Sequence, residues 1–190
     1  MNHSAPRYAA LIGVLLLLGS ALSAAYAQAP DGALERSHVR DYIRLRTHVH
    51  RMQEEMKATA DQYDDLLHPF FRRQTQFLQS KGWTQDGFDS VEQRILAAKG
   101  AMDWAADSTQ RRKRIENIKQ MTHLDADTRQ EMRTSFTKQD SLCRAQHMTP
   151  SRRDWPAVRL YRDGLRPLDD YVAKNRPDPP RLDALPPASP

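Results

Sequence analysis

The sequence predicts an all-α protein, a small helical bundle with one long amphipathic helix near its N-terminus. After the first 27 residues, apolar side chains recur at steps of three and four along most of the chain. No stretch alternates apolar and polar residues as a half-buried strand does. Residues that start or end helices, chiefly Thr, Asp, Gly and Pro, fall between the periodic stretches. The length fits one domain.

Residues 1–27 have the three parts of a cleavable secretory signal peptide. Arg7 supplies the positive charge, residues 9–22 form an apolar run, and Ala25-Tyr26-Ala27 places small residues around a cleavage site. The apolar run is shorter than the roughly 20 residues that a spanning helix needs. We therefore expect cleavage after Ala27 and a periplasmic or secreted protein. The alternative is an uncleaved N-terminus that anchors the chain to a membrane.

The long helix is expected to run without interruption from near Asp31 to near His68. Apolar residues in this stretch keep a heptad spacing, as in a coiled coil, and charged residues lie between them. The seam positions hold Tyr42, Val49, Met56, Tyr63 and Phe70 in one row and Leu45, Met52, Thr59 and Leu66 in the other. Such a narrow seam predicts a helix that packs along one stripe and is not buried all round.

Two capping signals mark the next elements. Pro69 suits the first turn of a helix over residues 69–81, and Gly82 is typical of a C-terminal cap. Thr84 is expected to cap the following helix, with Trp83 and Phe88 packing together as a hydrophobic staple. That helix presents one apolar face, formed by Phe88, Val91, Ile95, Ala98, Met102 and Ala105.

The second half of the chain predicts further helices. The helical pattern after Asp107 fits either an extension of the preceding helix or a separate short helix. Asp125 is expected to cap a helix that ends at Thr149-Pro150-Ser151. A last helix is expected from Asp154 onward, kinked at Pro167.

The C-terminal residues 175–190 differ in composition from the rest. They include six prolines in 16 residues, which predicts a disordered or polyproline-II tail. The helical domain is therefore expected to span residues 28–174.

The charge balance argues against a nucleic-acid partner. Residues 28–190 contain 28 Lys and Arg against 24 Asp and Glu, a net charge of +4, with both signs interspersed. Nucleic-acid binding domains carry a larger and more clustered excess. No other apolar run follows the first, so we expect no transmembrane segment after signal cleavage.

A run of four basic residues, Arg111, Arg112, Lys113 and Arg114, is the candidate anion-binding site. Such a cluster could bind phosphate groups of lipid headgroups or another polyanion. The alternative is a solvated helix face, because four consecutive residues are spread around a helix.

Metal binding is not predicted, and we expect no cofactor. Glu35-x-x-His38 and Asp65-x-x-His68 have the spacing used in di-metal helical bundles. Both pairs, however, lie on the one helix expected here, whereas those bundles use four helices.

An enzyme is not predicted either. Cys143 and His147 are four residues apart, a spacing that any helix contains, and no third orienting group is evident. Cys143 is the only cysteine, so an intramolecular disulfide is ruled out. We expect it to be a small buried residue, with a disulfide-linked homodimer or a reactive thiol as alternatives.

Residues 82–95, which include the cap at Thr84, and residues 155–161, which begin Trp155-Pro156, resemble a set of uncharacterised exported proteobacterial proteins. The resemblance covers about half of residues 28–190 and implies a helical bundle without a known activity. In size, export and charge the chain is similar to the periplasmic Spy and CpxP chaperones. Their Leu-Thr-x-x-Gln motif is missing, because residues 124–130 have a different spacing.

These observations predict a non-enzymatic, exported helical protein that binds other envelope proteins or acts as a chaperone-like module. Methionines in the long helix, such as Met52 and Met56, suit an adaptable apolar surface as well as a core. The alternative function is binding of a polyanion or membrane surface through Arg111–Arg114.

Overall fold

The computed structural model describes residues 32–62, 65–174 and 176–188, and these residues form helices and connecting turns without a strand. The prediction of an all-α fold is confirmed. The signal-peptide prediction for residues 1–27 lies outside the described residues. The elements are α2 (Arg36–Lys57), η1 (Ala60–Gln62), α3 (Leu67–Ser80), α4 (Gln85–Ala106), α5 (Ser108–Lys119), α6 (Ala126–Cys143), η2 (Arg144–Met148), α7 (Thr149–Ser151), η3 (Arg152–Asp154), α8 (Trp155–Leu160), α9 (Arg162–Ala173) and η4 (Leu182–Ala184).

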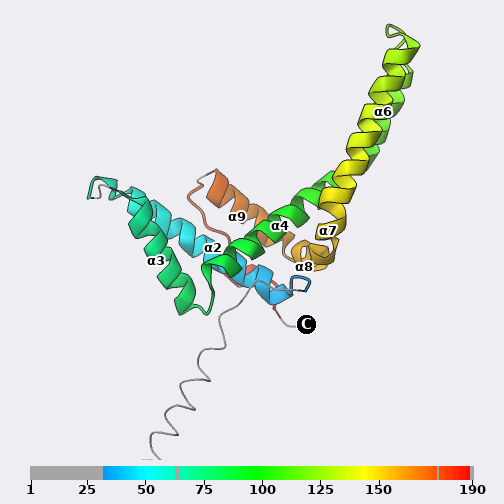
Figure 1. Cartoon of the computed structure of the whole chain (residues 1–190). Coiled ribbons are helices and arrows are strands. Elements are labelled where there is room, and N and C mark those ends of the chain that lie inside the picture. Colours follow the sequence, from blue (N-terminus) through cyan, green and yellow to red (C-terminus); the bar gives the residue numbers. More distant parts are fainter. Residues whose placement is uncertain (1–31, 63–64, 175, 189–190) are drawn as a thin grey trace, which may run out of the picture.

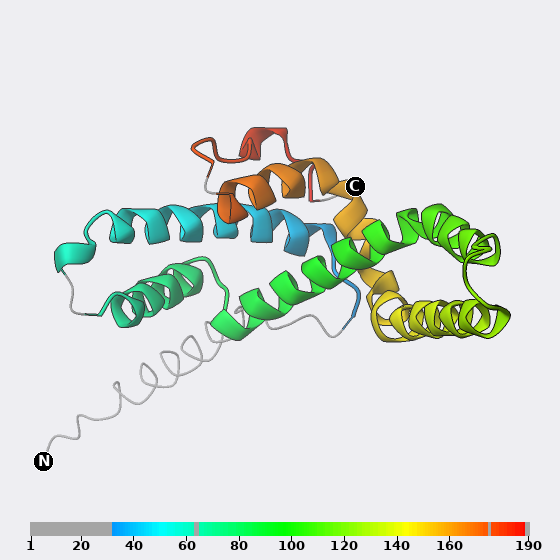
Figure 2. The same ribbon diagram turned by 90° about the horizontal axis from the view of Figure 1, so that it is seen from above.

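Helix α2 lies at the centre of the body and contacts α3, α4, α8 and α9 (Figures 1 and 2). The predicted seam residues Tyr42, Leu45, Val49, Met52 and Met56 are buried, and α2 keeps an exposed face, but the restriction of burial to one stripe is wrong. Thr47 and His50 lie outside both seam rows, yet they are 1% and 3% exposed. The ring of His50 meets the ring of Tyr171 on α9 edge to face, with 4.6 Å between centroids. Because α9 covers the side of α2 opposite the seam, both sides of this helix are buried.

The predicted uninterrupted helix to His68 is also wrong, because α2 ends at Lys57. The hydroxyl of Thr59 donates to the carbonyl oxygens of Glu55 and Met56, which competes with helix propagation. Asp65 then accepts from the backbone N–H of Leu67 at 2.8 Å, where α3 begins. The heptad spacing persists across this turn because α3 folds back onto α2. Tyr63, one of the predicted seam residues, lies outside the described residues.

The turn from α3 to α4 confirms both capping predictions. Gly82 has a φ of 76°, and the backbone N–H of Trp83 donates to the carbonyl of Leu78 at 2.9 Å, as in a Schellman motif. The Thr84 hydroxyl accepts from the backbone N–H of Gly87 at 3.0 Å. Trp83 and Phe88 are both buried in the same apolar cluster, as the staple predicts. Local sequence chemistry therefore determines this turn.

The main core lies between α2, α4, α8 and α9. Its fully buried members include Val39, Ile43, Val91, Val158 and Tyr161. Asp154, 2% exposed, lies beside this core and is ion-paired with Arg94 of α4. This pair joins the start of α8 to α4.

Beyond the core, α5 and α6 form an antiparallel hairpin that projects away from the body (Figures 1 and 2). We call residues 108–148 the arm. A break at Asp107 makes α5 a separate helix, which answers the question that the sequence left open. Asp125 caps α6 as predicted, because its Oδ1 accepts from the backbone N–H of Thr128 at 2.8 Å.

The predicted end of that helix at Thr149 is wrong. After Cys143 the chain continues as the π-helical η2 and then as α7. Pro150 lies in the first turn of α7, where the missing N–H of proline has no helical partner to lose. The helical path therefore passes through Thr149-Pro150-Ser151.

The last predicted helix is interrupted at Tyr161 and not at Pro167. Tyr161 leaves helical geometry, with a φ of −101° and a ψ of 15°, and α9 begins at the next residue. Pro167 lies inside α9. As the sixth residue of α9, Pro167 removes the hydrogen bond that a backbone N–H here would donate to the carbonyl of Asp163, yet the helix continues to Ala173.

Residues 176–188 are not a disordered tail, which corrects the sequence prediction. Leu185 is 8% exposed and belongs to the main core. The hydroxyl of Tyr161 donates to the carbonyls of Pro186 and Pro187, at 3.1 and 3.2 Å. Prolines lose little conformational freedom on folding, so one buried leucine and these hydrogen bonds suffice to hold the segment against α8 and α9.

Candidate functional site: the cleft and charged surface of the arm

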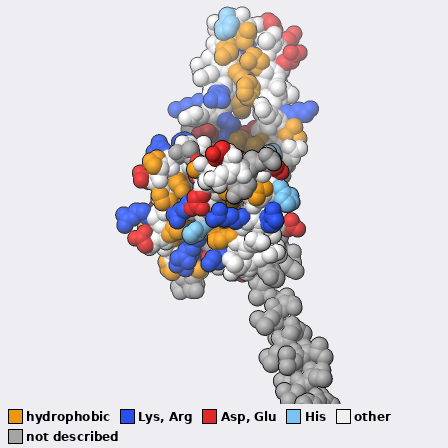
Figure 3. All heavy atoms as spheres, turned by 90° about the vertical axis from the view of Figure 1, so that its left-hand side faces the viewer, with side chains coloured by type: hydrophobic (Ala, Val, Ile, Leu, Met, Phe, Trp, Pro, Cys, Tyr) orange, Lys and Arg blue, Asp and Glu red, His pale blue; other side chains and the backbone are white. Residues whose placement is uncertain are grey.

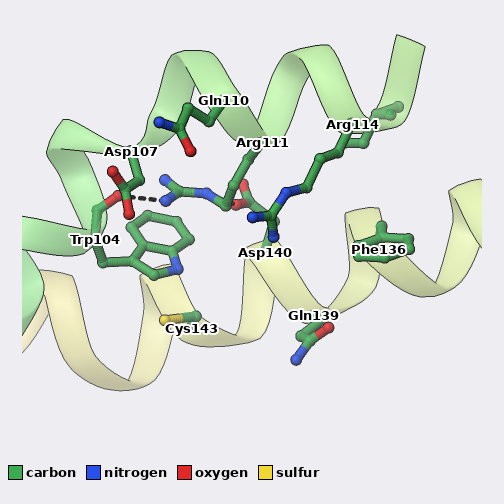
Figure 4. A pocket seen from close by; sticks show the side chains of 10 residues that line it. Trp104, Asp107, Gln110, Arg111, Arg114, Phe136, Gln139, Asp140 and Cys143 are labelled. Carbon is green, nitrogen blue, oxygen red and sulfur yellow. Dashed lines mark hydrogen bonds and ion pairs between the residues drawn. The ribbon is translucent and has the colours of Figure 1, made fainter. Parts of the chain in front are cut away.

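A cleft of about 430 Å³ opens between α5 and α6 where the arm joins the body (Figure 4). Its apolar lining consists of Trp104, Ile115, Phe136 and Cys143. Its polar lining includes Asp107, Gln110, Arg111, Arg114, Gln139 and Asp140. Phe136 keeps 40% of its surface exposed although the two helices pack side by side. The two helices therefore do not close over Phe136, and the cleft between them is open to solvent.

Arg111, the first member of the predicted anion site, is occupied by contacts within the chain. Its guanidinium carbon lies 3.5 Å from the centre of the Trp104 ring, a cation–π contact. Its Nε donates to Oδ1 of Asp140 at 2.9 Å, and its Nη1 donates to the backbone carbonyl of Trp104 (Figure 4). Arg111 thus joins the end of α4 to α6 and is not free to bind an anion.

The other three basic residues do not converge on one ligand. Each successive residue turns by about 100° around a helix, so Arg112 and Lys113 point away from the cleft that Arg114 lines. Within the described part of the chain, none of these three side chains forms an ion pair. The predicted four-residue cluster is therefore one structural arginine and three unpaired cations on different faces of α5.

Two residues of the cleft were missed by the sequence prediction. Trp104 contacts Arg111 from seven residues earlier, across the break at Asp107, whereas Asp140 lies 29 residues after Arg111 and is brought to it by the hairpin. No local pattern distinguishes Asp140 from the other exposed acids of α6. Cys143, expected to be buried, is half-buried beside them and is a free thiol.

The two sides of the arm differ in charge. The cleft side carries Gln110, Arg114 and Gln139. Leu142 of α6 is 48% exposed and does not line the cleft. On α5, Arg112 and Lys119 are seven residues apart and share a face that lies about 100° around the helix from Arg111; we call this face of α5 the basic side. Figure 3 shows hydrophobic side chains along the length of the projecting arm. The arm is thus apolar along part of its surface and cationic along another part.

The arm also holds most of the net charge of the chain. Residues 108–148 contain nine Lys and Arg against five Asp and Glu, a net charge of +4. The whole chain has a net charge of +5. Three of the nine cations are paired inside the arm, as Arg111 and Arg144 with Asp140 and Lys119 with Glu116. The excess positive charge is therefore located on one projecting element.

The motif Glu35-x-x-His38 has a structural role. The backbone N–H of Glu35 donates to Nδ1 of His38 at 3.0 Å, which forms a capping box at the start of α2. Residues 32–62, 65–174 and 176–188 contain no group of three or more His, Cys, Asp or Glu side chains that could hold a metal ion. His123 and His147 are both exposed.

In comparisons with known proteins, no protein-family model, curated protein or solved structure matches the chain. Its resemblance to exported helical proteins stays a prediction. Over the ranges that the structure describes, every helix is too short or too polar to cross a membrane.

Proposed function

We propose that this protein is a non-enzymatic binding module that contacts an acidic protein surface through the basic side of its arm. The observation that carries the proposal is the location of the charge: a net +4 of the chain's +5 belongs to residues 108–148, which project from the body (Figure 1). A charged element that stands clear of the body can meet a partner without rearrangement of the core. Clustered charge of one sign also accelerates encounter with a partner of the opposite sign.

The pairing of charges supports this reading. The body outside the arm has nearly balanced charge and uses its acids in ion pairs with neighbouring helices, such as Glu92 with Arg46 and Asp154 with Arg94. Arg112 and Lys113, by contrast, form no ion pair among the described residues. An acidic partner would supply the missing counter-charges. Exposed apolar side chains such as Phe136 would add contacts that salt does not screen.

The test uses a defined probe, a reduced and carboxymethylated α-lactalbumin, which is acidic and permanently unfolded. Binding is measured by fluorescence anisotropy at low and high salt. We expect Arg112→Glu with Lys119→Glu to weaken binding by about tenfold or more, because two exposed cations on one face of α5 become acids on the contact surface. The matched control is Arg152→Glu with Arg159→Glu, an equal change of charge at exposed positions of the body.

Equal loss of binding in the arm and control variants would overturn the proposal, because the effect would then follow net charge alone. Binding to vesicles that contain phosphatidylglycerol, together with no binding to the acidic protein, would also overturn it. That result would favour the alternative function, binding of a membrane surface or polyanion by the same cations.

We further propose that the protein acts in the periplasm or outside the cell. The signal-peptide pattern of residues 1–27 supports this location. N-terminal sequencing of the protein from a periplasmic extract should find Gln28 as the first residue. An intact N-terminus in the membrane fraction would contradict cleavage.

A further inference from the structure

We infer that the exposed face of α2 is a docking surface for an extended acidic segment of another protein. The face carries four arginines, Arg36, Arg40, Arg44 and Arg51, which we call the arginine row. The row belongs to the body, whereas the proposed function concerns the basic side of the arm. The two proposals are therefore independent of each other.

The first argument is the alignment of the row. Its first three members follow one another at steps of four residues, and Arg51 lies seven residues after Arg44, so the row stays within about 80° of the helix circumference. Neighbours among the first three are about 6 Å apart along the helix axis, and the whole row spans about 22 Å. The four cations therefore lie along one strip of the surface, unlike the consecutive residues Arg111–Arg114.

The strip runs between two other helices. Figure 2 shows α2 between α3 and α9. On one side of the row, the ring of His48 lies 5.6 Å from that of Phe77 on α3, measured between centroids, and on the other side His50 contacts Tyr171 of α9. A groove of about 460 Å³, lined in part by His48, Arg51 and Phe77, opens between α2 and α3 at the end of the row. A strip bordered in this way fits a narrow chain better than a flat membrane surface.

The second argument is that the row lacks counter-charges of its own. None of its four arginines forms an ion pair with another residue that the structure describes. Two acids of α2 lie on the same face, Asp41 and Glu55, and Glu55 is paired with Arg73 of α3 at 3.5 Å. The Nε of Arg40 is shielded from solvent and has no hydrogen-bond partner. Like charges four residues apart destabilise a helix, so a bound anion would stabilise α2.

The third argument concerns the spacing and the type of the cations, which indicate the occupant. Along an extended chain, side chains on one face recur at every second residue, about 6.6 Å apart. This repeat is close to the distance of about 6 Å between the first arginines of the row. Guanidinium groups bind carboxylates through two parallel hydrogen bonds. An extended segment of about seven residues with acids at alternate positions therefore matches the row in length, spacing and charge.

The test measures binding of a fluorescent peptide, in which four glutamates alternate with glycines, to the chain as recovered from the cell. Fluorescence anisotropy at low salt gives the affinity. We expect Arg36→Glu with Arg44→Glu to weaken binding by about tenfold or more, because two cations of the row become acids. The matched control is Arg112→Glu with Lys119→Glu, an equal change of charge on the basic side of the arm, which should leave binding of this peptide unchanged.

A single variant tests the end of the row beside the groove. Arg51→Glu should weaken binding of the same peptide several-fold, because Arg51 lines the groove and has no counter-charge. Its control is Arg72→Glu, at an exposed position of α3 that does not line the groove, and this change should have no effect. Equal effects of the two changes would contradict a site on α2.

A second peptide tests the spacing. It has the same composition, but its four glutamates are consecutive, so an extended chain turns only half of them toward the row. It should bind several-fold more weakly than the alternating peptide. Equal binding of the two peptides, or equal loss in the row and arm variants, would overturn the inference, because binding would then follow net charge alone. Binding of inorganic polyphosphate without binding of either peptide would also overturn it. Because Arg112 variants test the arm and Arg36 variants test the row, either proposal can fail while the other stands.

Discussion

Arg94 on α4 donates from Nε to Oδ2 of the buried Asp154 at 3.0 Å and from Nη2 to Oδ1 of the same carboxylate. Asp154 Oδ1 also accepts from the backbone N–H of Leu34 at 2.9 Å, and Arg94 Nη2 donates to the carbonyl of Gly32. One ion pair thus connects α4, the start of α8 and the chain that leads into α2. The arrangement is bidentate and largely shielded from water. Loss of either side chain would therefore leave the other charge buried without its counter-charge.

We expect Arg94→Ala to lower the free energy of unfolding by about 3–5 kcal/mol, because Asp154 would remain buried without its cation. Urea denaturation followed by circular dichroism measures the loss. The matched control is Arg153→Ala, whose Nε lies 4.0 Å from the same carboxylate while its side chain is 55% exposed. This control should cost less than about 1 kcal/mol. Equal losses would show that the pair is not a structural connection.

The two glycines at Gly82 and Gly100 should respond to alanine in opposite directions. Gly82→Ala should destabilise the protein by about 1–2 kcal/mol, because φ at this position is 76° and a Cβ atom is strained there. Gly100 lies inside α4 with no atom near an added Cβ, so Gly100→Ala should stabilise by roughly 0.5–1 kcal/mol. Thermal unfolding of both variants gives the sign of each change. Destabilisation by both would contradict the assigned helix geometry.

Leu185→Ala tests whether the C-terminal segment belongs to the fold. The leucine is 8% exposed in the main core, so its truncation should destabilise the protein by about 2–3 kcal/mol. Asp183→Ala, at an exposed position two residues earlier, should change stability by less than about 0.5 kcal/mol. Chemical denaturation compares the two. No difference between them would mean that the segment does not pack on α8 and α9.

The Asp125 carboxylate, which caps the start of α6, should make a contribution to the free energy of unfolding that depends on pH. Hydrogen bonds from the backbone N–H and hydroxyl of Thr128 lower the pKa of Asp125 below its usual value of 3.8. Since the folded pKa is the lower one, this contribution is present above pH 3.8 and is lost as the pH falls through the folded pKa. Thr128→Val should raise the Asp125 pKa toward its usual value, measured by carboxyl-carbon NMR titration.

The companion variant Asp125→Asn keeps an acceptor at the helix start but no longer titrates. It should therefore remove this part of the acid sensitivity of α6 while leaving the helix capped at neutral pH. Hydrogen exchange of the first turn of α6 at neutral and acid pH measures the effect. An unchanged dependence on pH would assign the acid sensitivity to other carboxylates.

Much of the local structure follows from the sequence for identifiable reasons. Gly82, Thr84 and Asp125 act on backbone groups within five residues, so their capping roles are readable without a fold. The all-α class follows from the spacing of apolar residues over the whole chain. The end of α2 at Lys57 was not readable, because the heptad spacing continues across the turn where α3 folds back.

The candidate site also has a part that the sequence predicts and a part that only the fold shows. The cluster Arg111–Arg114 is visible in the sequence, but its common function as an anion site was predicted from adjacency alone. The structure assigns Arg111 to Trp104 and Asp140, and it leaves Arg112 and Arg114 on opposite sides of the arm. The contact of Arg111 with Asp140, 29 positions further along, depends on how the hairpin closes, which no local pattern encodes.

By itself, then, the sequence determined the helical class, the helix caps and the basic cluster, because each depends on residues within a few turns of one another. Only the tertiary structure decided that α2 is buried on both sides, that Leu185 belongs to the core and that α5 and α6 project as a charged arm. Those features depend on which surfaces meet in space, and the free energy of burial is decided by contacts between elements distant in the chain.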